Sequence, residues 1–325
     1  MQDFYEITKD EQVARLELLG REALMEFGVE PVELSPLIHA ENATFRVSSS
    51  AGEFCLRISR PGYQSTENIR SEILFLDALS TAGFKVPHPW QPRVVTTSLE
   101  WVPEERDCVL FHWIEGPILR SGMTPEHAFE LGALTARLHD FTLDWTEPPE
   151  FSRQRVHTWL LDPGERMAFE EPTPMVLEED RLLLVEVVEA SRRGASTLPQ
   201  DKSWLRLIHS DMHPGNLVLH KGAVHVIDFD DTGYGFLIYD FAASLAYIVG
   251  SPDYEAMENS LLAGYESIAP LPESARELLP AFLKLRLASI ANWSASRTDH
   301  PEFRTGSAKF VHSLCERIRS MTGGS

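Results

Sequence analysis

The sequence predicts an α+β fold with two lobes, a smaller β-rich lobe followed by a larger and mainly helical one. The chain has 325 residues, which is enough to bury two hydrophobic cores of moderate size. Extended segments gather in its first third, where two amphipathic helices accompany them. Apolar residues at helical spacing dominate the rest of the chain, and one β-hairpin interrupts them.

The composition indicates a globular protein, since 43% of the residues are hydrophobic. The formal net charge of −20 at pH 7 argues against a nucleic-acid partner and against an anionic membrane surface. No apolar run approaches the roughly 20 residues that span a bilayer. Cys55, Cys108 and Cys315 are widely spaced, as expected of reduced thiols in a cytoplasmic protein. Nothing in the sequence indicates an oligomeric state.

One amphipathic helix and three strands are expected near the N-terminus. Their ranges are Lys9–Phe27, Glu33–Ile38, Thr44–Val47 and Glu53–Ser59. In the last strand apolar residues alternate with Cys55 and Arg57, so Arg57 is expected on the face opposite the apolar one. An exposed arginine on an edge strand is the alternative interpretation.

A second helix is expected to begin with Thr66 as its N-cap and to end at Gly83. Glu72 lies one turn from Leu76 and from the other apolar residues of this helix, which places it on the buried stripe. A buried carboxylate needs a cationic partner, and Arg57 is the natural candidate. A solvated position for Glu72 at the flank of the helix is the alternative.

The most informative stretch is Leu207–Asp231, with the sequence LIHSDMHPGNLVLHKGAVHVIDFDD. Apolar runs, a polar loop and a Lys-Gly turn predict strands over Leu205–Ile208, Leu217–Leu219 and Ala223–Phe229. The second and third strands would pair as an antiparallel hairpin. Asp211, Asn216 and Asp228 are therefore expected at the same end of that hairpin.

This arrangement suits phosphoryl transfer. The reaction needs a carboxylate beside the attacking hydroxyl and hard oxygen ligands that hold Mg²⁺ against nucleotide phosphates. Two other interpretations use the same residues. His209, Asp211 and His213 could form one face of a transition-metal site on a strand, although this would leave Asn216 and Asp228 without a role. The polar loop could also be a solvated turn.

Four motifs carry a resemblance to a known family. They are His209-x-Asp211-x-x-x-x-Asn216, Asp228-Phe229-Asp230, the Pro214-Gly215 pair before the asparagine, and Gly235-x-x-x-x-Asp240. Together they resemble the aminoglycoside phosphotransferase-like family, which includes choline and homoserine kinases and has the bilobal protein-kinase-like fold. The resemblance implies a nucleotide-binding lobe over residues 1–113 and a catalytic and acceptor-binding lobe over residues 114–325. It also implies ATP and Mg²⁺ as cofactors.

The resemblance assigns roles to individual residues. Asp211 would orient and deprotonate the acceptor, and Asn216 and Asp228 would hold Mg²⁺. Arg57 would contact the α- and β-phosphates, and Glu72 would brace Arg57, like the lysine–glutamate pair of kinases.

Other implied roles concern the nucleotide and the support of the catalytic loop. Asn42 matches a residue often found in the hairpin over the phosphates, which has few glycines here. Phe111 and Trp113, in the apolar run 109–114, would lie where the adenine ring binds. Asp240 would cap the catalytic-loop region and His209 would brace it. Asp230 could add a metal or substrate contact.

The remaining elements are mostly helical. A helix capped by Thr124 is expected to bury Phe129, Leu131, Leu134 and Leu138, and His139 near its end is interpreted as a packing or capping residue. Further helices are expected over Met175–Ser191, Phe236–Val249, Ser251–Glu266, Glu273–Arg297 and Gly306–Met321. A loop is expected over Arg192–Ser203.

The predicted activity is transfer of the ATP γ-phosphoryl group to a hydroxyl of a small molecule. A bacterial Ser/Thr protein kinase of the same fold and a catalytically silent nucleotide-binding module are the alternatives. The excess of acidic residues is compatible with an acceptor that bears an amine, or with surface solubility alone. The carboxylates considered for an amine are Glu165, Glu170, Glu171, Glu178, Glu179, Asp180, Asp230 and Asp231.

Overall fold

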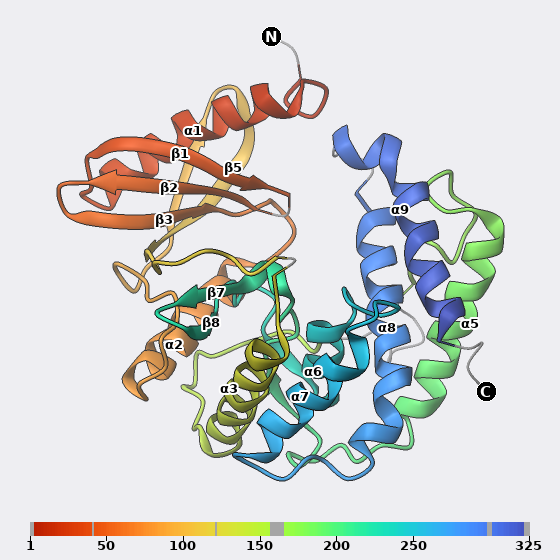
Figure 1. The fold of residues 1–325 in the computed structure, drawn as a ribbon. Helices are drawn as coiled ribbons and strands as arrows, with labels where there is room; N and C mark the ends of the chain where they lie inside the picture. Colours follow the sequence, from red (N-terminus) through yellow and green to blue (C-terminus); the bar gives the residue numbers. More distant parts are fainter. Residues whose placement is uncertain (1–2, 41, 121, 157–165, 298–300, 322–325) are drawn as a thin grey trace. The chain divides into compact units, whose positions relative to one another are not determined.

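The computed structural model describes residues 3–40, 42–120, 122–156, 166–297 and 301–321. They fall into two compact units. The first comprises the described residues up to Glu115 and the segment Glu147–Ser152, and the second comprises Gly116–Thr146 and almost all of the chain from Arg153 onward. A β-sheet occupies the first unit and helices dominate the second (Figure 1), so the predicted α+β class is confirmed. The lobe boundary predicted after residue 113 stays a prediction.

The first unit contains two helices and one five-stranded antiparallel sheet, with strands in the order β1-β2-β3-β5-β4. The helices are α1 (Lys9–Glu26) and α2 (Thr66–Thr81), and the strands are β1 (Pro31–His39), β2 (Ala43–Ser49), β3 (Gly52–Ile58), β4 (Val95–Leu99) and β5 (Val102–His112). The predicted strands therefore exist, each within a few residues of its expected ends.

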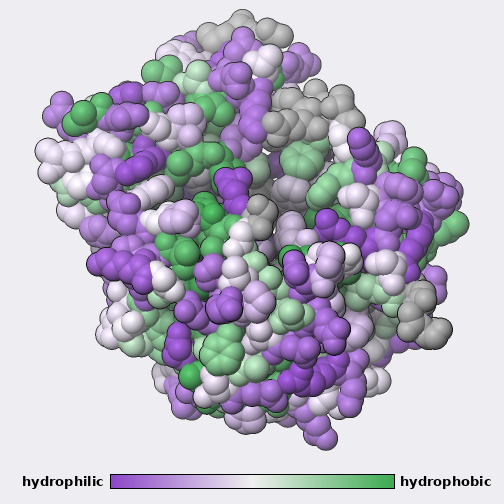
Figure 2. Space-filling model, viewed as in Figure 1, coloured by the Kyte–Doolittle hydropathy of each residue, from purple (hydrophilic) through white to green (hydrophobic). Residues whose placement is uncertain are grey.

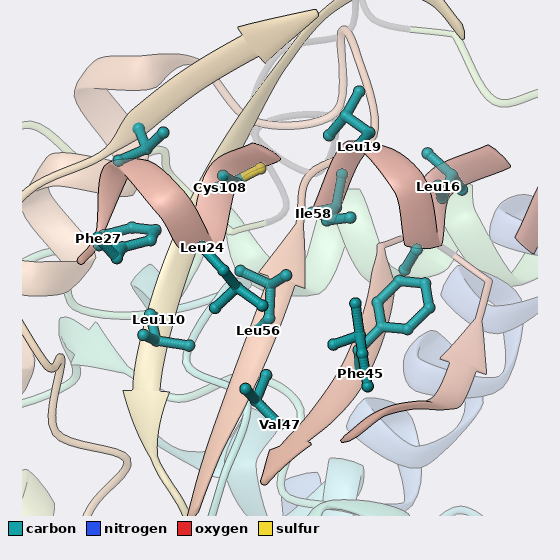
Figure 3. Packing of buried hydrophobic residues seen from close by; sticks show 14 of the residues in the cluster. Leu16, Leu19, Leu24, Phe27, Phe45, Val47, Leu56, Ile58, Cys108 and Leu110 are labelled. Atoms are coloured by element: carbon teal, nitrogen blue, oxygen red, sulfur yellow. The ribbon is translucent and has the colours of Figure 1, made fainter. Parts of the chain in front are cut away.

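The core of the first unit lies between α1 and the sheet. Figure 3 shows Leu19 and Leu24 of α1 packed against apolar side chains of β2, β3 and β5, among them Leu56. Each fully buried leucine contributes about 1.5–3 kcal/mol of transfer free energy. Helix and sheet approach closely at Gly20, where an added Cβ would lie 2.9 Å from Leu56 Cδ2. Helix α1 thus covers the apolar face of β3, and Arg57 projects from the opposite face.

The N-cap of helix α2 lies one residue before the predicted one. Its N-cap is Ser65, whose hydroxyl accepts a hydrogen bond from the Asn68 N–H. Thr66 is the first helical residue, and its hydroxyl donates to the Asp107 carboxylate at 2.5 Å instead of capping the helix. Because both residues are good caps, the sequence alone did not separate them. The helix ends as predicted, with Gly83 at a φ of +89°.

The second unit contains two small two-stranded sheets and six described helices. Its helices are α3 (Pro125–Asp144), α5 (Glu178–Ala195), α6 (Ile238–Leu245), α7 (Tyr254–Glu266), α8 (Ala275–Ala295) and α9 (Pro301–Ser320). Its strands are β6 (Leu205–Ile208), β7 (Leu217–His220), β8 (Ala223–Val226) and β9 (Gly233–Phe236). Strand β6 pairs with β9, and β7 pairs with β8.

The predicted hairpin forms between β7 and β8, and its turn is Lys221–Gly222, with φ angles of +52° and +84°. These positive angles at both central residues are typical of a two-residue hairpin turn. The predicted third strand was too long, because β8 ends at Val226. Asp228 has a φ of +67°, a conformation in which a strand cannot continue. The pairing of β6 with β9 was not predicted.

Helix α3 packs on α7 at unusually short range, because two glycines face the partner backbone. A Cβ added at Gly132 would lie 1.9 Å from the Leu261 carbonyl oxygen, and one at Gly264 would lie 1.9 Å from the Phe129 carbonyl oxygen. Thr124 caps α3 as predicted. The prediction that Phe129 points inward was wrong, since its side chain is 42% exposed. The small residues of α3 bury its contact face instead.

Several other helix boundaries differ from the prediction, among them the end of α5 and the start of α9. Helix α5 runs to Ala195, so part of the expected loop is helical. Arg192 and Arg193 lie in its last turn, where cations interact favourably with the helix dipole and allow the helix to continue. Helix α9 begins at Pro301, five residues before the predicted start. Proline is well tolerated in the first turn of a helix, so it did not stop this one.

Hydrophilic residues cover most of the visible face in Figure 2, with smaller hydrophobic areas between them. Large exposed apolar side chains occur on several elements, such as Met25 on α1, Val32 on β1 and Leu182 on α5. No helix in the described part of the chain has an apolar stretch of the length that crosses a membrane.

Candidate active site

The catalytic-loop motif connects β6 to β7 in the second unit. Pro214–Asn216 forms one turn of 3₁₀ helix directly before β7. Leu217 pairs with Val226 across the hairpin, and the Ile227 N–H donates to the Asn216 carbonyl oxygen at 2.9 Å. Asn216 and the residues that follow β8 are therefore neighbours, as the sequence predicted.

Asp211 lies at the centre of this cluster, with its side chain 19% exposed. Its Oδ2 accepts a hydrogen bond from Asn216 Nδ2 at 2.9 Å and lies 3.5 Å from His213 Nε2. Its Oδ1 accepts from the Arg286 guanidinium on α8. Burial alone would raise the pKa of the Asp211 carboxyl, but the charge of Arg286, followed by His213, holds it well below its usual value. Asp211 is thus a carboxylate at neutral pH.

Asn216 and Asp228 offer the oxygen atoms that Mg²⁺ prefers. Asn216 Nδ2 donates both to the Asp211 carboxylate and to the Asp211 carbonyl oxygen, at 2.9 and 3.0 Å, which turns Asn216 Oδ1 away from Asp211. The Asp228 side chain is exposed and stands at the left-handed φ described above. Such a conformation is costly for an aspartate and is found preferentially at functional sites. An amide oxygen beside an exposed carboxylate fits a hard divalent cation.

Asp240, the first acidic residue of α6, holds the backbone of the catalytic loop. Its carboxylate accepts from the His209 N–H at 3.2 Å and from the Ser210 N–H at 2.6 Å. Ser210 has a φ of +69°, so these bonds fix a strained residue directly before Asp211. His139 Nε2 lies 3.0 Å from the same carboxylate. The predicted capping by Asp240 and the packing role of His139 are confirmed.

His209 braces the loop from inside. It is completely buried, and its Nδ1 accepts the Asp211 N–H at 3.2 Å. His213 Nδ1 accepts the Gly215 N–H at 2.9 Å. The Nδ1 atoms of both histidines are therefore occupied by backbone donors, which does not favour a transition-metal site at His209, Asp211 and His213. Burial lowers the pKa of His209 below its ordinary value.

Arg153 holds the segment that follows Asp228, and the sequence did not single it out. Its guanidinium donates to three backbone carbonyl oxygens, of Thr232 at 2.6 Å, Asp230 at 2.5 Å and Phe229 at 3.3 Å. The Asp230 side chain is only 5% exposed. Arg153 lies in an irregular stretch, where no periodic pattern marks a buried arginine.

In the first unit, Arg57 and Glu72 form the predicted pair. Two parallel hydrogen bonds join them, Nη1 to Oε1 at 2.8 Å and Nη2 to Oε2 at 2.5 Å, and the side chains are 5% and 1% exposed. The guanidinium carbon also lies 5.2 Å from the centre of the Phe111 ring. The alternative interpretations of a solvated Glu72 and an exposed Arg57 were wrong.

The other predicted nucleotide residues also lie in the first unit. Trp113 stacks with Arg46, whose guanidinium carbon is 4.7 Å from the ring centre. Asn42 Oδ1 accepts the Arg60 N–H at 3.2 Å, which ties the turn between β1 and β2 to the chain after β3. The side chain of Asn42 therefore contributes to the shape of this turn. Roles for these residues in nucleotide binding stay predictions.

Arg286 was missed, although a signal for it exists in the sequence. It lies one helical turn from Leu283 and from Ile290, both of which are buried on α8. A charge on an apolar helix stripe needs a partner, the same argument that identified Glu72. The partner, Asp211, is 75 residues away in the chain.

Four of the eight acidic residues considered for an amine-bearing acceptor pair with basic side chains. Glu170 contacts Arg192, Glu171 contacts Arg166 and Glu178 contacts Arg181. The buried Asp180 accepts from His312 at 2.8 Å and from Arg319 at 2.7 Å. Glu165 lies outside the described residues. The charges of these carboxylates are thus compensated by neighbouring basic residues.

The sequence pattern of the phosphotransferase enzyme family matches residues 33–278. The match covers most of the chain, and we conclude that the chain belongs to this family. The matched range includes the catalytic loop, the hairpin and the Arg57–Glu72 pair. The predicted enzyme class, a phosphotransferase, is therefore confirmed.

Individual relatives agree with this assignment. The solved structure of a microcompartment-associated aminopropanol kinase is 28% identical, superimposes with a TM-score of 0.80, and is matched over 94% of this chain and 98% of its own. The homoserine kinase of Xanthobacter autotrophicus is 27% identical over 271 residues, 78% of each protein. Amicoumacin kinase hAmiN, solved with AMP-PNP and Ca²⁺, shares the fold at 20% identity, with a TM-score of 0.75 and 97% of both chains covered. The kinase-like fold is thus confirmed.

Proposed function

We propose that this protein transfers the γ-phosphoryl group of ATP to a hydroxyl group of a small molecule, with Mg²⁺ as the metal. The observation that carries the proposal is the hydrogen bond from Asn216 Nδ2 to Asp211 Oδ2, at 2.9 Å, together with the exposed Asp228, which follows the residue whose N–H bonds the Asn216 carbonyl oxygen. One group to receive a proton and two oxygen ligands for a metal thus occur within a single loop and hairpin.

In this proposal Asp211 positions the acceptor hydroxyl and takes its proton. The acceptor oxygen forms a bond to the γ-phosphorus, the bond from that phosphorus to the β–γ bridging oxygen breaks, and ADP leaves. Asn216 and Asp228 would hold Mg²⁺, which when bound neutralises charge on the phosphates. Asp240 and Arg153 keep the loop and the Asp228 segment in place through their bonds to the backbone.

Arg57 is proposed to contact the α- and β-phosphates, with Glu72 fixing the direction of its guanidinium. The two parallel hydrogen bonds support this role, because they hold Arg57 in one rotamer. Phe111 and Trp113 are proposed for the adenine and Asn42 for the turn over the phosphates. A cytoplasmic location is part of the proposal, since Cys55, Cys108 and Cys315 are free thiols.

The acceptor is proposed to be a small amino compound with a hydroxyl group. Aminopropanol and homoserine, for which two of the relatives are named, both carry an amine and a hydroxyl. Homoserine also carries a carboxylate, which aminopropanol lacks. A protein substrate is the alternative for this fold.

ADP release measured over a panel of acceptors tests the proposal. The panel holds amino alcohols, hydroxy amino acids, sugars, aminoglycosides and a metabolite extract, each with ATP and Mg²⁺, and a protein lysate serves as the competing substrate. We expect acceptor-dependent ADP release with at least one small molecule. Phosphate incorporated only into protein, or ATP turnover that no acceptor stimulates, would contradict a small-molecule kinase.

A further inference from the structure

Arg286 reaches from α8 to the catalytic loop and contacts the reacting carboxylate. Its side chain is 11% exposed, and its Nη2 donates to Asp211 Oδ1. Its Nη1 lies 3.4 Å from the Tyr239 hydroxyl, and its guanidinium carbon lies 5.8 Å from the centre of the Tyr239 ring. Helix α6, which carries Tyr239, therefore helps to hold the guanidinium at this place.

The guanidinium of Arg286 has donors to spare. It offers five N–H groups in a planar fork, and its buried Nε meets no hydrogen-bond acceptor within the described part of the chain. A buried donor without a partner costs free energy, which a bound ligand can recover. The planar fork can bind a carboxylate through two parallel hydrogen bonds.

Both oxygens of Asp211 are occupied before an acceptor arrives. Asn216 Nδ2 holds Oδ2, and the same amide nitrogen also bonds the Asp211 carbonyl oxygen at 3.0 Å, so this contact belongs to the loop. Oδ1 is held by the side chain of Arg286 from another element. An acceptor hydroxyl that bonds Asp211 thus takes the Oδ1 side, and the carbons that carry it lie next to Arg286.

Two charged side chains adjoin this position, the Arg286 guanidinium and the Asp211 carboxylate. Arg286 lies on one side of Asp211 and His213 Nε2 lies 3.5 Å from its other oxygen. The ring of His213 packs against Tyr247 at 5.0 Å between centroids, so a neutral aromatic side chain adjoins it. Asp240, the nearby acidic residue of α6, directs its carboxylate to the backbone of His209 and Ser210. An anion fits beside Arg286, and a cation at the same place would be repelled.

We propose that Arg286 binds a carboxylate of the acceptor, which makes the acceptor a short β- or γ-hydroxy acid, and that Arg286 thereby determines acceptor specificity. This inference rests on the proposed phosphotransferase function and names the substrate class of the same site. The carboxylate bonds Arg286 through Nε and a neighbouring amino group while the hydroxyl bonds Asp211. An amine elsewhere on the acceptor is compatible with this arrangement.

Three pairs of compounds test the inference, because the members of each pair differ by one carboxylate. They are L-threonine with 1-amino-2-propanol, L-homoserine with 3-amino-1-propanol, and L-serine with 2-aminoethanol. For the wild-type protein with ATP and Mg²⁺, we expect kcat/KM to favour the carboxylate-bearing member of the best pair by about 10²- to 10⁴-fold, the share of two charge-assisted hydrogen bonds.

Substitutions of Arg286 then separate recognition from mere packing. Arg286→Gln should bring the ratio of kcat/KM within the best pair close to one, mainly through a higher KM for the carboxylate-bearing member. Arg286→Lys keeps the charge but loses the planar fork, so it should retain part of the ratio. Because it keeps the charge opposite Asp211, it also serves as the test variant if Arg286→Gln does not fold. The matched control is Arg276→Gln on the same helix, whose exposed side chain pairs with Glu266 at 2.8 Å. It should leave the ratio unchanged.

The outcomes distinguish this inference from the proposed function. A wild-type preference for the members without a carboxylate, or a ratio that Arg286→Gln and Arg286→Lys leave unchanged, overturns the inference while the kinase function stands. Transfer to other hydroxyl compounds but to no member of the three pairs also overturns it. Failure to transfer phosphate to any hydroxyl compound would instead overturn the proposed function itself.

Discussion

Two buried arginine–carboxylate pairs, one in each unit, have similar chemistry and different surroundings. Arg57 and Glu72 meet through two parallel hydrogen bonds and are 5% and 1% exposed. Arg286 meets one oxygen of Asp211, which is 19% exposed and shares its other oxygen with Asn216. In the first pair one arginine holds both carboxylate oxygens, whereas the two oxygens of Asp211 are divided between Arg286 and Asn216.

Because of this difference, Arg57–Glu72 can fix the local structure, whereas Asp211–Arg286 can exchange one partner for another. Removing one member of a fully buried ion pair leaves an uncompensated charge, which destabilises a protein by about 3–5 kcal/mol. A more accessible pair can open, because water or a ligand replaces the lost contact. We infer that Arg57–Glu72 preorganises the first unit and that Asp211–Arg286 takes part in the reaction.

The largest effect is expected at Asp211. Asp211→Asn keeps the size and the contact with Asn216 but cannot accept a proton, so turnover should fall by about 10²–10⁴ while thermal stability changes little. Asp253→Asn is the control, since Asp253 is exposed at the start of α7 and its side chain makes no capping bond. Turnover near the wild-type rate in purified Asp211→Asn would remove Asp211 from the proposed role.

The next effect concerns the metal. Asp228→Ala removes a proposed Mg²⁺ ligand, so the Mg²⁺ concentration that gives half-maximal activity should rise at least about 10-fold, which is the lower end of what outer-shell changes alone produce. The measurement is a magnesium titration of ATP binding and of turnover. If neither the midpoint nor the rate moved, Asp228 would serve the conformation of the segment and not the metal.

The Arg57–Glu72 pair in the first unit should behave as one unit. Arg57→Ala should weaken ATP binding more than acceptor binding, and Glu72→Ala should add little to it, because both act through the same guanidinium. A double-mutant cycle on ATP affinity should give a coupling of about 0.5–3 kcal/mol. Fully additive losses would show that the two side chains act independently, contrary to their 2.5 and 2.8 Å contacts.

A smaller effect on stability, which depends on pH, is expected from the two buried histidines that support the catalytic loop. Burial lowers the pKa of both His139 and His209, so the folded protein takes up fewer protons than the unfolded chain below the ordinary histidine pKa of about 6.5. Their contribution to stability is complete above that pH and is lost as the pH falls through the lower folded pKa. The free energy of unfolding should decline by up to about 1.4 kcal/mol per pH unit for each histidine.

Urea unfolding at pH 7.5 and 5.5 measures this decline, with His139→Gln as the test variant. The variant should be less stable at pH 7.5 and should lose less stability between the two pH values. An identical decline in the variant and the wild type would show that His139 does not titrate in this range.

The parts of the fold and site predicted from the sequence are those set by local patterns. Alternation in β3 placed Arg57, and the apolar stripe of α2 placed Glu72, so their pairing followed from two short segments. The hairpin turn at Lys221–Gly222 likewise fixed the register that brings Asn216 beside Ile227. Each of these inferences spans few residues, and each uses a geometry that side-chain spacing determines.

The parts that were missed depend on contacts between distant segments. Arg286 meets Asp211 across 75 residues, and Arg153 meets the carbonyl oxygens of the Asp228 segment across 76 to 79 residues. The four-residue strand β6 is too short to indicate its partner β9. Phe129 was misplaced because Gly132 and Gly264 allow backbones to touch, which moves the contact face of α3 away from its largest side chains.

The central claim is that the γ-phosphoryl group passes intact to an acceptor hydroxyl beside Asp211. ATP labelled with ¹⁸O on the three terminal oxygens of its γ-phosphate tests this directly, with the product analysed by mass spectrometry. The account predicts a phosphorylated small molecule that carries all three labelled oxygens, formed with Mg²⁺ by the wild-type protein and almost absent with Asp211→Asn. Label found only in inorganic phosphate or on protein, or an equal yield from Asp211→Asn, would contradict it.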